Sequence, residues 1–232
     1  DDREHAPLIR ADWDVMYVSY SPSGRYRVSA VNRDARTAVT IRDEDSGESL
    51  PLADLPAGDL TGLRFNRDET EVTFAVNGDT APPDVFALTL DTGKTRRLTR
   101  ALNPAIDASQ LVEGEVLRFA SYDGLEVPGI IYRPREASAE RPVPALVYVH
   151  GGPGGQSRKG YRAAIQHLVN HGYAVYAINN RGSSGYGKTF YHLDDLRHGE
   201  ADLGDVVASR DFLAGLDWID GELEWLSTGV SL

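Results

Sequence analysis

The chain has 232 residues, 41% of them hydrophobic and 25% charged, and a formal net charge of −11. So acidic a chain has no electrostatic footprint for nucleic acid, and no cluster of Lys and Arg supplies a local one. Its apolar runs are too short to span a membrane, and the absence of cysteine excludes disulfides, thiolate metal sites and a cysteine nucleophile. Composition leaves both a cytoplasmic and a periplasmic or secreted location open.

Both ends of the sequence resemble cut or processed termini. The chain opens on DDREHAPLIR, without Met or a signal-peptide pattern, and closes on WLSTGVSL, without a recognisable finishing element. We therefore expect the sequence to be part of a longer protein.

Residues 15–100 are rich in short strand-like runs separated by turn sequences such as SPSG and DSG. The pattern repeats after about 45 residues, so that residues 21–28 align with residues 66–74. Four short strands per repeat predict about two blades of a β-propeller, and an unrelated pair of antiparallel meanders is the alternative. Because a propeller needs about four or more blades, the first interpretation implies further blades before Asp1.

After about Asp107 the pattern becomes that of an α/β fold. Strands are predicted over 125–134, 145–149 and 173–179, the last two being continuous apolar runs of the kind found in buried parallel strands. A helix is predicted between the last two strands and ends at Gly172, with one apolar face. This face comprises Tyr161, Ile165, Leu168 and Val169.

A second amphipathic helix is predicted over residues 202–216. The apolar residues expected to face the core are Leu203, Val206, Val207, Leu213 and Leu216.

Two Gly-rich loops follow the buried strands. The second, NNRGSSGYGKTF (179–190), contains a literal G-x-x-x-x-G-K-[ST] match at 182–189, the pattern of a phosphate-binding P-loop. Its context argues against that function, because the following segment is a poor helix that carries Asp194 and Asp195 where triphosphate charge would lie.

The first loop, HGGPGG (150–155), changes the function expected of the second loop. HGGP after one strand, with N-x-R-G-S-x-G-Y-G-x-x-F after the next, resembles the prolyl oligopeptidase family of serine peptidases, in particular its acylaminoacyl-peptidase-like and dipeptidyl-peptidase-like branches. The resemblance implies an α/β-hydrolase domain, represented by the N-terminal part of its sheet, preceded by about two β-propeller blades. Residues 1–106 would belong to the propeller and residues 107–232 to the hydrolase, with 221–232 unlike the family.

The resemblance also implies roles for individual residues. The backbone amides of Gly151 and Gly152 are candidates for the oxyanion hole, and a tight strand-exit turn is the alternative reason for these glycines. Arg181 and Tyr186 would lie in a loop beside the active-site entrance. His150 precedes any candidate serine, so a loop-orienting role is expected rather than that of general base.

Two further histidines are predicted to be surface residues. His192 and His198 flank an acidic loop without metal-ligand spacing. The resemblance implies no cofactor and no metal ion.

The nucleophile motif G-x-S-x-G is absent from the sequence. Ser227 and Ser157 lie in segments that only partly fit it. The family activity is hydrolysis of short peptides through an acyl-enzyme, but this chain is expected to lack the triad and to be inactive alone. A non-catalytic propeller or pseudo-enzyme binding module is the alternative, and a P-loop nucleotide binder is a third interpretation.

Overall fold

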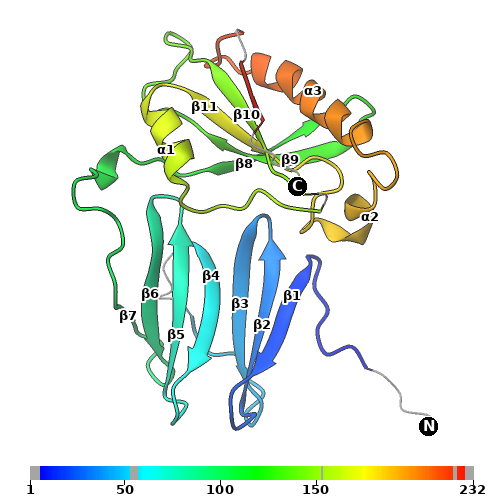
Figure 1. Cartoon of the computed structure of the whole chain (residues 1–232). Helices are drawn as coiled ribbons and strands as arrows, with labels where there is room; N and C mark the ends of the chain where they lie inside the picture. The colour runs from blue at the N-terminus through cyan, green and yellow to red at the C-terminus, as the bar shows by residue number, and fades with distance from the viewer. Residues whose placement is uncertain (1–5, 53–56, 153, 222–223, 228–232) are drawn as a thin grey trace.

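The computed structural model describes residues 6–52, 57–152 and 154–221, and the backbone of residues 224–227. Two small antiparallel sheets stand side by side, and a larger mixed sheet with helices lies across their upper ends (Figure 1). In the described part of the chain, no helix combines the length and the apolar character needed to cross a bilayer.

The N-terminal part forms the two small sheets. The first contains β1 (Val15–Tyr20), β2 (Tyr26–Arg33) and β3 (Arg36–Asp43), and the second contains β4 (Asp59–Phe65), β5 (Glu71–Gly78), β6 (Ala81–Thr89) and β7 (Thr95–Arg97). In both sheets the strands follow one another antiparallel in chain order.

The four-strand prediction holds for the second sheet and is wrong for the first. The segment ESLPL (48–52) forms only an isolated bridge, between Arg42 and Ser49. The Leu50 N–H donates to the Ile41 carbonyl at 2.8 Å, but Pro51 has no N–H with which to continue the pairing.

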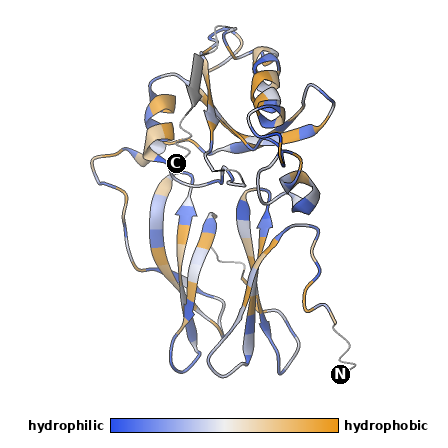
Figure 2. Cartoon of the chain, turned by 45° about the vertical axis from the view of Figure 1, so that its right-hand side comes forward, coloured by the Kyte–Doolittle hydropathy of each residue, from blue (hydrophilic) through white to orange (hydrophobic). Residues whose placement is uncertain are grey.

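One apolar core joins the two small sheets. Residues along β2 and β5 alternate between buried and partly exposed positions, and hydrophobic and polar bands alternate along the strands in Figure 2. The buried members come from both sheets and include Val28, Ile41, Val72, Phe74 and Leu88. Each sheet therefore covers the other's apolar face, as neighbouring propeller blades do.

The third sheet has the strand order β12-β10-β11-β9-β8. Its members are β8 (Glu115–Ala120), β9 (Glu126–Tyr132), β10 (Ala145–Val149), β11 (Ala174–Ile178) and β12 (Glu224–Ser227). Strands β11, β10 and β12 are parallel, whereas β8 and β9 form an antiparallel hairpin beside β11.

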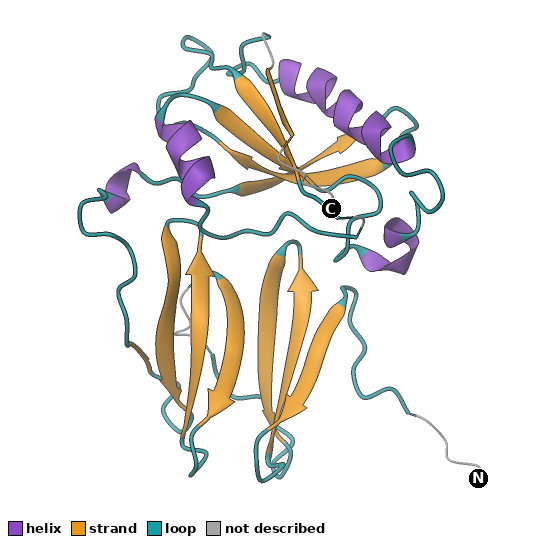
Figure 3. Ribbon diagram, viewed as in Figure 1, coloured by secondary structure: helices purple, strands orange, loops and turns teal. Residues whose placement is uncertain are grey.

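Helices cover both faces of this sheet (Figure 3). Helix α1 (Ala163–Asn170) buries Ile165 and Val169 against Val175, and α3 (Ala201–Ala214) buries Leu213 in the cluster that contains Tyr176. Because Val175 and Tyr176 are consecutive in β11, their side chains point to opposite faces. The remaining short helices are η1 (Ala108–Gln110) and α2 (Gly187–Tyr191).

The predicted apolar face of the second helix is partly wrong. Leu203 and Val207 are 52% and 55% exposed, while Asp205 and Ser209 are fully buried. The helix turns Asp205, rather than Leu203 and Val207, toward the core because Asp205 has a buried cationic partner, described below. The sequence analysis also placed no strand after residue 221, whereas β12 pairs there with β10.

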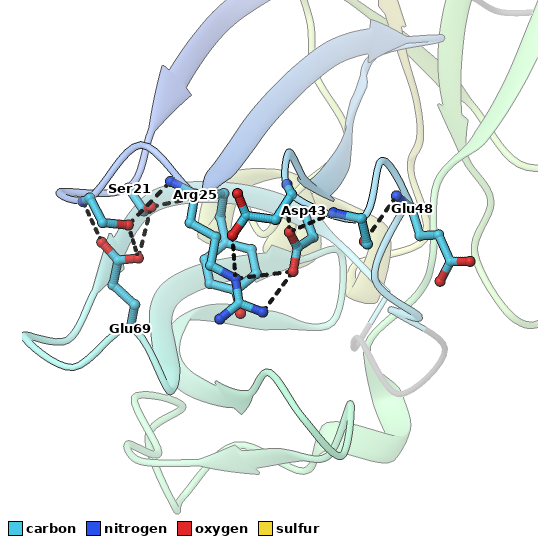
Figure 4. Close-up of polar contacts among 9 residues, drawn as sticks. Ser21, Arg25, Asp43, Glu48 and Glu69 are labelled. Carbon is cyan, nitrogen blue, oxygen red and sulfur yellow. Dashed lines mark hydrogen bonds and ion pairs between the residues drawn. The ribbon is translucent and has the colours of Figure 1, made fainter.

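A polar contact connects the two small sheets at the end remote from the helices. The Glu69 carboxylate accepts hydrogen bonds from the Ser21 hydroxyl at 3.0 Å and from the Ser23 N–H at 2.6 Å (Figure 4). The Ser23 contacts are the main reason why the pKa of Glu69 is lowered. Nearby, Arg25 donates to Asp43 within the first sheet. The turn before β2 is thus tied to the turn before β5.

A close approach inside the third sheet requires glycine. A Cβ at Gly129, in β9, would overlap the ring of Tyr176 in the neighbouring strand, and Tyr176 is fully buried. The ring therefore packs directly on the β9 backbone.

Replacing Gly129 by Ala is expected to lower the free energy of unfolding by about 1–3 kcal/mol, because the packed Tyr176 ring has to move. Urea denaturation measures the change. Gly221→Ala is the matched control, since a Cβ there has nothing within 4 Å. Equal effects of the two substitutions would contradict this account of Gly129.

Candidate active site

Both Gly-rich loops leave the same edge of the third sheet. The HGGPGG loop follows β10 and the NNRGSSGYGKTF loop follows β11, and the two strands are parallel and adjacent. In α/β sheets, ligands bind outside the carboxyl ends of parallel strands. This edge is therefore the candidate active site.

A histidine–serine contact joins the two loops. His150 Nε2 lies 2.9 Å from Ser183 Oγ, and Ser183 donates its hydroxyl to the Asn180 carbonyl at 2.6 Å. Since a carbonyl only accepts, Nε2 carries the proton and donates to Ser183. Burial lowers the pKa of His150, which favours this neutral form. The geometry supports the predicted loop-orienting role of His150.

Asn179, which the sequence analysis did not single out, holds the first loop against the second strand. Its Oδ1 accepts from the Ser157 N–H at 2.6 Å, and its Nδ2 donates to the Ser157 carbonyl at 3.0 Å. The side chain is fully buried, so both ends of the amide need partners. The position of Asn179 directly after a buried apolar strand is the sequence signal that could have identified it.

The predicted oxyanion donors lie in the exposed part of the first loop. Gly152 has φ +68°, a conformation that favours glycine, and a Cβ there would meet nothing within 4 Å. Its carbonyl accepts from the Gly155 N–H at 2.9 Å, which closes a turn. Gly151 is likewise exposed. This conformation is compatible with both predicted roles, oxyanion donor and strand-exit turn.

Arg181, predicted as an entrance-loop residue, has a buried side chain. It is 5% exposed, and its guanidinium donates to both carboxylate oxygens of Asp205, at 2.8 and 3.0 Å. It also donates to both oxygens of Asp123, at 2.8 and 2.9 Å. These hydrogen bonds raise the pKa of Arg181, and those with Asp205 have the largest effect. With its donors engaged, the side chain has a structural role.

Further contacts complete this buried network. The Ser121 hydroxyl donates to Asp205 at 2.6 Å, and the Arg181 guanidinium lies 4.7 Å from the centre of the Tyr122 ring. The network ties the loop after β11 to α3 and to the β8–β9 turn.

Tyr186, the other entrance-loop candidate, is partly buried in the second loop. Its ring makes edge contacts with Trp13 and Phe190, and its hydroxyl accepts from Asn179 Nδ2 at 2.9 Å. Burial raises the pKa of Tyr186 to about 12. These contacts give Tyr186 a packing function within the loop.

In the segment that matches the P-loop pattern, backbone amides already bind a carboxylate from elsewhere in the chain. The N–H groups of Gly185 and Gly187 donate to the Asp14 carboxylate at 3.0 and 3.4 Å. The helix that follows has only five residues. A bound phosphate would have to displace Asp14 from these amides.

The segment after the first loop contacts both small sheets. Arg158 donates to both oxygens of Asp59, at 2.7 and 3.2 Å, and to the Thr37 hydroxyl at 2.9 Å. The Tyr161 N–H donates to Asn77 at 3.0 Å. The conformation of this segment therefore depends on the N-terminal sheets.

His192 and His198 are exposed, as predicted, and both have carboxylate partners. His192 contacts Asp195 at 2.7 Å, whereas His198 contacts both Asp194 and Asp202. The second arrangement was not expected from the sequence. Asp202 also lines a cavity of about 410 Å³ beside α3.

Fold and sheet order place the chain among proteins that combine propeller-like sheets with an α/β-hydrolase part, and comparison with known proteins agrees. Residues 159–231 match the family model described as "Prolyl oligopeptidase family". The match extends into residues 221–232, which the sequence analysis set apart from the family.

Two relatives illustrate the likeness. The chain is 30% identical over 152 residues to the uncharacterized peptidase YuxL of Bacillus subtilis, covering 66% of this chain and 23% of the relative. It is 32% identical over 139 residues to dipeptidyl aminopeptidase BIII of Pseudoxanthomonas mexicana, covering 57% and 20%. The chain thus spans less than a quarter of the length of either relative.

Among solved structures, a puromycin-hydrolyzing peptidase of Mycobacterium tuberculosis superposes with a TM-score of 0.83 at 20% identity, covering 95% of this chain and 36% of the other. This likeness concerns the fold. Together, the family match and the relatives confirm the resemblance of the chain to the prolyl oligopeptidase family of peptidases.

Asp205→Asn is expected to lower the free energy of unfolding by about 3 kcal/mol, because it leaves the buried Arg181 cation with one carboxylate partner fewer. Urea denaturation provides the measurement. Asp211→Asn, at an exposed position of the same helix, is the control and should have little effect. A small effect of Asp205→Asn would contradict the structural role of the pair.

Asp123 is expected to make stability depend on acid pH. The Arg181 hydrogen bonds lower the pKa of Asp123 from 3.8 to about 2. A carboxyl with a lowered pKa in the folded state stabilises the fold above its unfolded value, and this contribution is lost as the pH falls from about 4 to 2. The stability difference between the wild type and Asp123→Asn should therefore shrink across this window. A constant difference in urea titrations would contradict the assignment.

Proposed function

We propose that the chain is part of a serine-type peptidase that hydrolyses peptide bonds in short peptides through an acyl-enzyme. The observation that carries the proposal is the junction of the two Gly-rich loops, fixed by His150–Ser183 and Asn179–Ser157 at the carboxyl edge of the third sheet. The relatives named as peptidases support the reaction class, and the dipeptidyl aminopeptidase supports small peptide substrates.

Within this function, the loop after β10 would stabilise the oxyanion. In α/β-hydrolases, a backbone N–H from the loop after the third strand binds the oxygen that becomes negative in the tetrahedral intermediate. Gly151 and Gly152 would supply that N–H, since their exposed backbone permits close approach of a substrate. The positioning contacts from Asn179 and His150 would hold the loop ready before substrate binds.

We further propose that residues 1–106 act as the propeller part and residues 107–232 as the hydrolase part. The change from antiparallel sheets to a mixed sheet with helices supports the division.

The 232-residue chain is proposed to lack triad chemistry by itself. Ser157 is 2% exposed, and Ser183 is fully buried with its hydroxyl donated to a carbonyl, which argues against either as a nucleophile. Ser227 is the last residue of β12, and its backbone pairs with Val149 beside the first loop. The sequence around Ser227 lacks the G-x-S-x-G elbow.

The complete reading frame that contains these residues provides the test. Its product is expected to hydrolyse dipeptidyl or acylaminoacyl p-nitroanilides and to react with a fluorophosphonate probe, while the 232-residue chain stays unlabelled. Labelling of this chain at Ser227, Ser157 or Ser183 would overturn the proposed inactivity. A complete product without hydrolysis or labelling would instead favour a non-catalytic binding module.

Gly152→Ala in the complete product is expected to lower kcat by about a hundredfold, because the residue's backbone conformation is strained by a Cβ and the donor N–H is displaced. Gly124→Ala is the matched control, with φ +84° and open surroundings in the β8–β9 turn. If both variants retain full kcat, the oxyanion assignment of Gly152 is wrong.

A further inference from the structure

Three side chains with metal-ligating atoms meet beside the first turn of α3. Asp194 and His198 come from the segment between α2 and α3, and Asp202 belongs to α3. His198 Nδ1 lies 3.3 Å from an Asp194 oxygen and 3.2 Å from an Asp202 oxygen. One ligand atom from each residue falls within 4.8 Å of the other two.

The two carboxylates are largely withdrawn from solvent. The side chains of Asp194 and Asp202 are 8% and 13% exposed, whereas that of His198 is 58% exposed. Within the described residues, neither carboxylate forms an ion pair with Lys or Arg. Among the described residues, their shared ion-pair partner is His198.

The surroundings also provide an oxygen without a partner. Asn180 is 8% exposed, and its Oδ1 is buried without a hydrogen bond. Asn180 and Asp202 line the same cavity of about 410 Å³. An amide oxygen binds a cation directly or accepts a hydrogen bond from a metal-bound water, so Asn180 is a further candidate ligand on the Asp202 side of the group.

The backbone is adapted to this arrangement. A Cβ at Gly182 would overlap the Asp194 carboxylate, so glycine lets the carboxylate lie directly against the loop after β11. The Gly199 N–H donates to Asp202 Oδ1 at 2.7 Å, which fixes that carboxylate and leaves its Oδ2 toward His198.

We propose that Asp194, His198 and Asp202 form a binding site for a divalent transition-metal ion, with Zn²⁺ as its best-suited occupant. Ligand atoms about 2.0–2.2 Å from Zn²⁺ lie about 3.2–3.6 Å apart around a tetrahedron, which matches the two His198 distances. One imidazole and two carboxylates suit zinc better than calcium or magnesium, which prefer oxygen ligands alone. The fourth position would belong to water or to Asn180.

Isothermal titration of the 232-residue chain with zinc chloride, followed by thermal unfolding with and without zinc, tests the site. The exposed pair His167 and His171 on α1, whose rings lie 4.1 Å apart, is a second place for zinc, so the parent for all titrations is His171→Ala. In this background, zinc is expected to bind one to one and to raise the Tm. Magnesium and calcium at the same concentration should have little effect.

Adding His198→Ala is expected to weaken zinc binding by at least about tenfold and to abolish the Tm increase. Because His198 is largely exposed, the variant should fold, and its Tm without zinc checks this. Adding His192→Ala instead is the matched control, because His192 contacts one carboxylate but belongs to no three-ligand group among the described residues. Absence of saturable zinc binding in the parent, or equal binding by the His198 and His192 variants, would overturn the proposal.

Discussion

The buried pair of Arg181 and Asp205 sets the arrangement of α3 and the loop after β11 on the third sheet. Asp205 is fully buried and receives two guanidinium hydrogen bonds, the Arg181 N–H and the Ser121 hydroxyl. Leaving either charge unpaired in this environment is costly, so α3 has to turn its Asp205 side inward. The exposure of Leu203 and Val207 follows from that rotation. So does the position of Asp202, one turn earlier on the helix, beside Asp194 and His198.

A second constraint acts on the loops at the sheet edge. Side chains at the ends of β10 and β11 hold the described backbone around both loops. Asn179 binds both backbone polar groups of Ser157, and the His150 side chain contacts the Ser183 hydroxyl. Such contacts let irregular backbone hold one conformation.

The sequence predicted those features that depend on local pattern. The strands at 145–149 and 173–179, the helix ending at Gly172 and the repeat of the N-terminal sheets all left periodic or turn signals. The position of Arg181 was not predictable in this way, because its partners Asp123 and Asp205 are distant in the chain and look like ordinary surface acids. His198 is a different case, because its carboxylate neighbours Asp194 and Asp202 lie only four residues away on either side, in the turns before α3 and in its first turn. Residues 48–52 pair only briefly because Pro51 lacks the N–H that the next hydrogen bond of the ladder would need.

The segment between the first loop and α1 bears on how the two parts of the molecule can move. Arg158 is anchored on Asp59 and Thr37, while Ser157, next to it, is clamped by Asn179 of the third sheet. Any hinge motion that lifts the N-terminal sheets away has to break the Arg158 ion pair or pull on Ser157. Separation of the N-terminal sheets from the third sheet would therefore also displace the backbone at Ser157, just after the glycine loop. The conformation of this loop would then depend on whether the two parts are in contact.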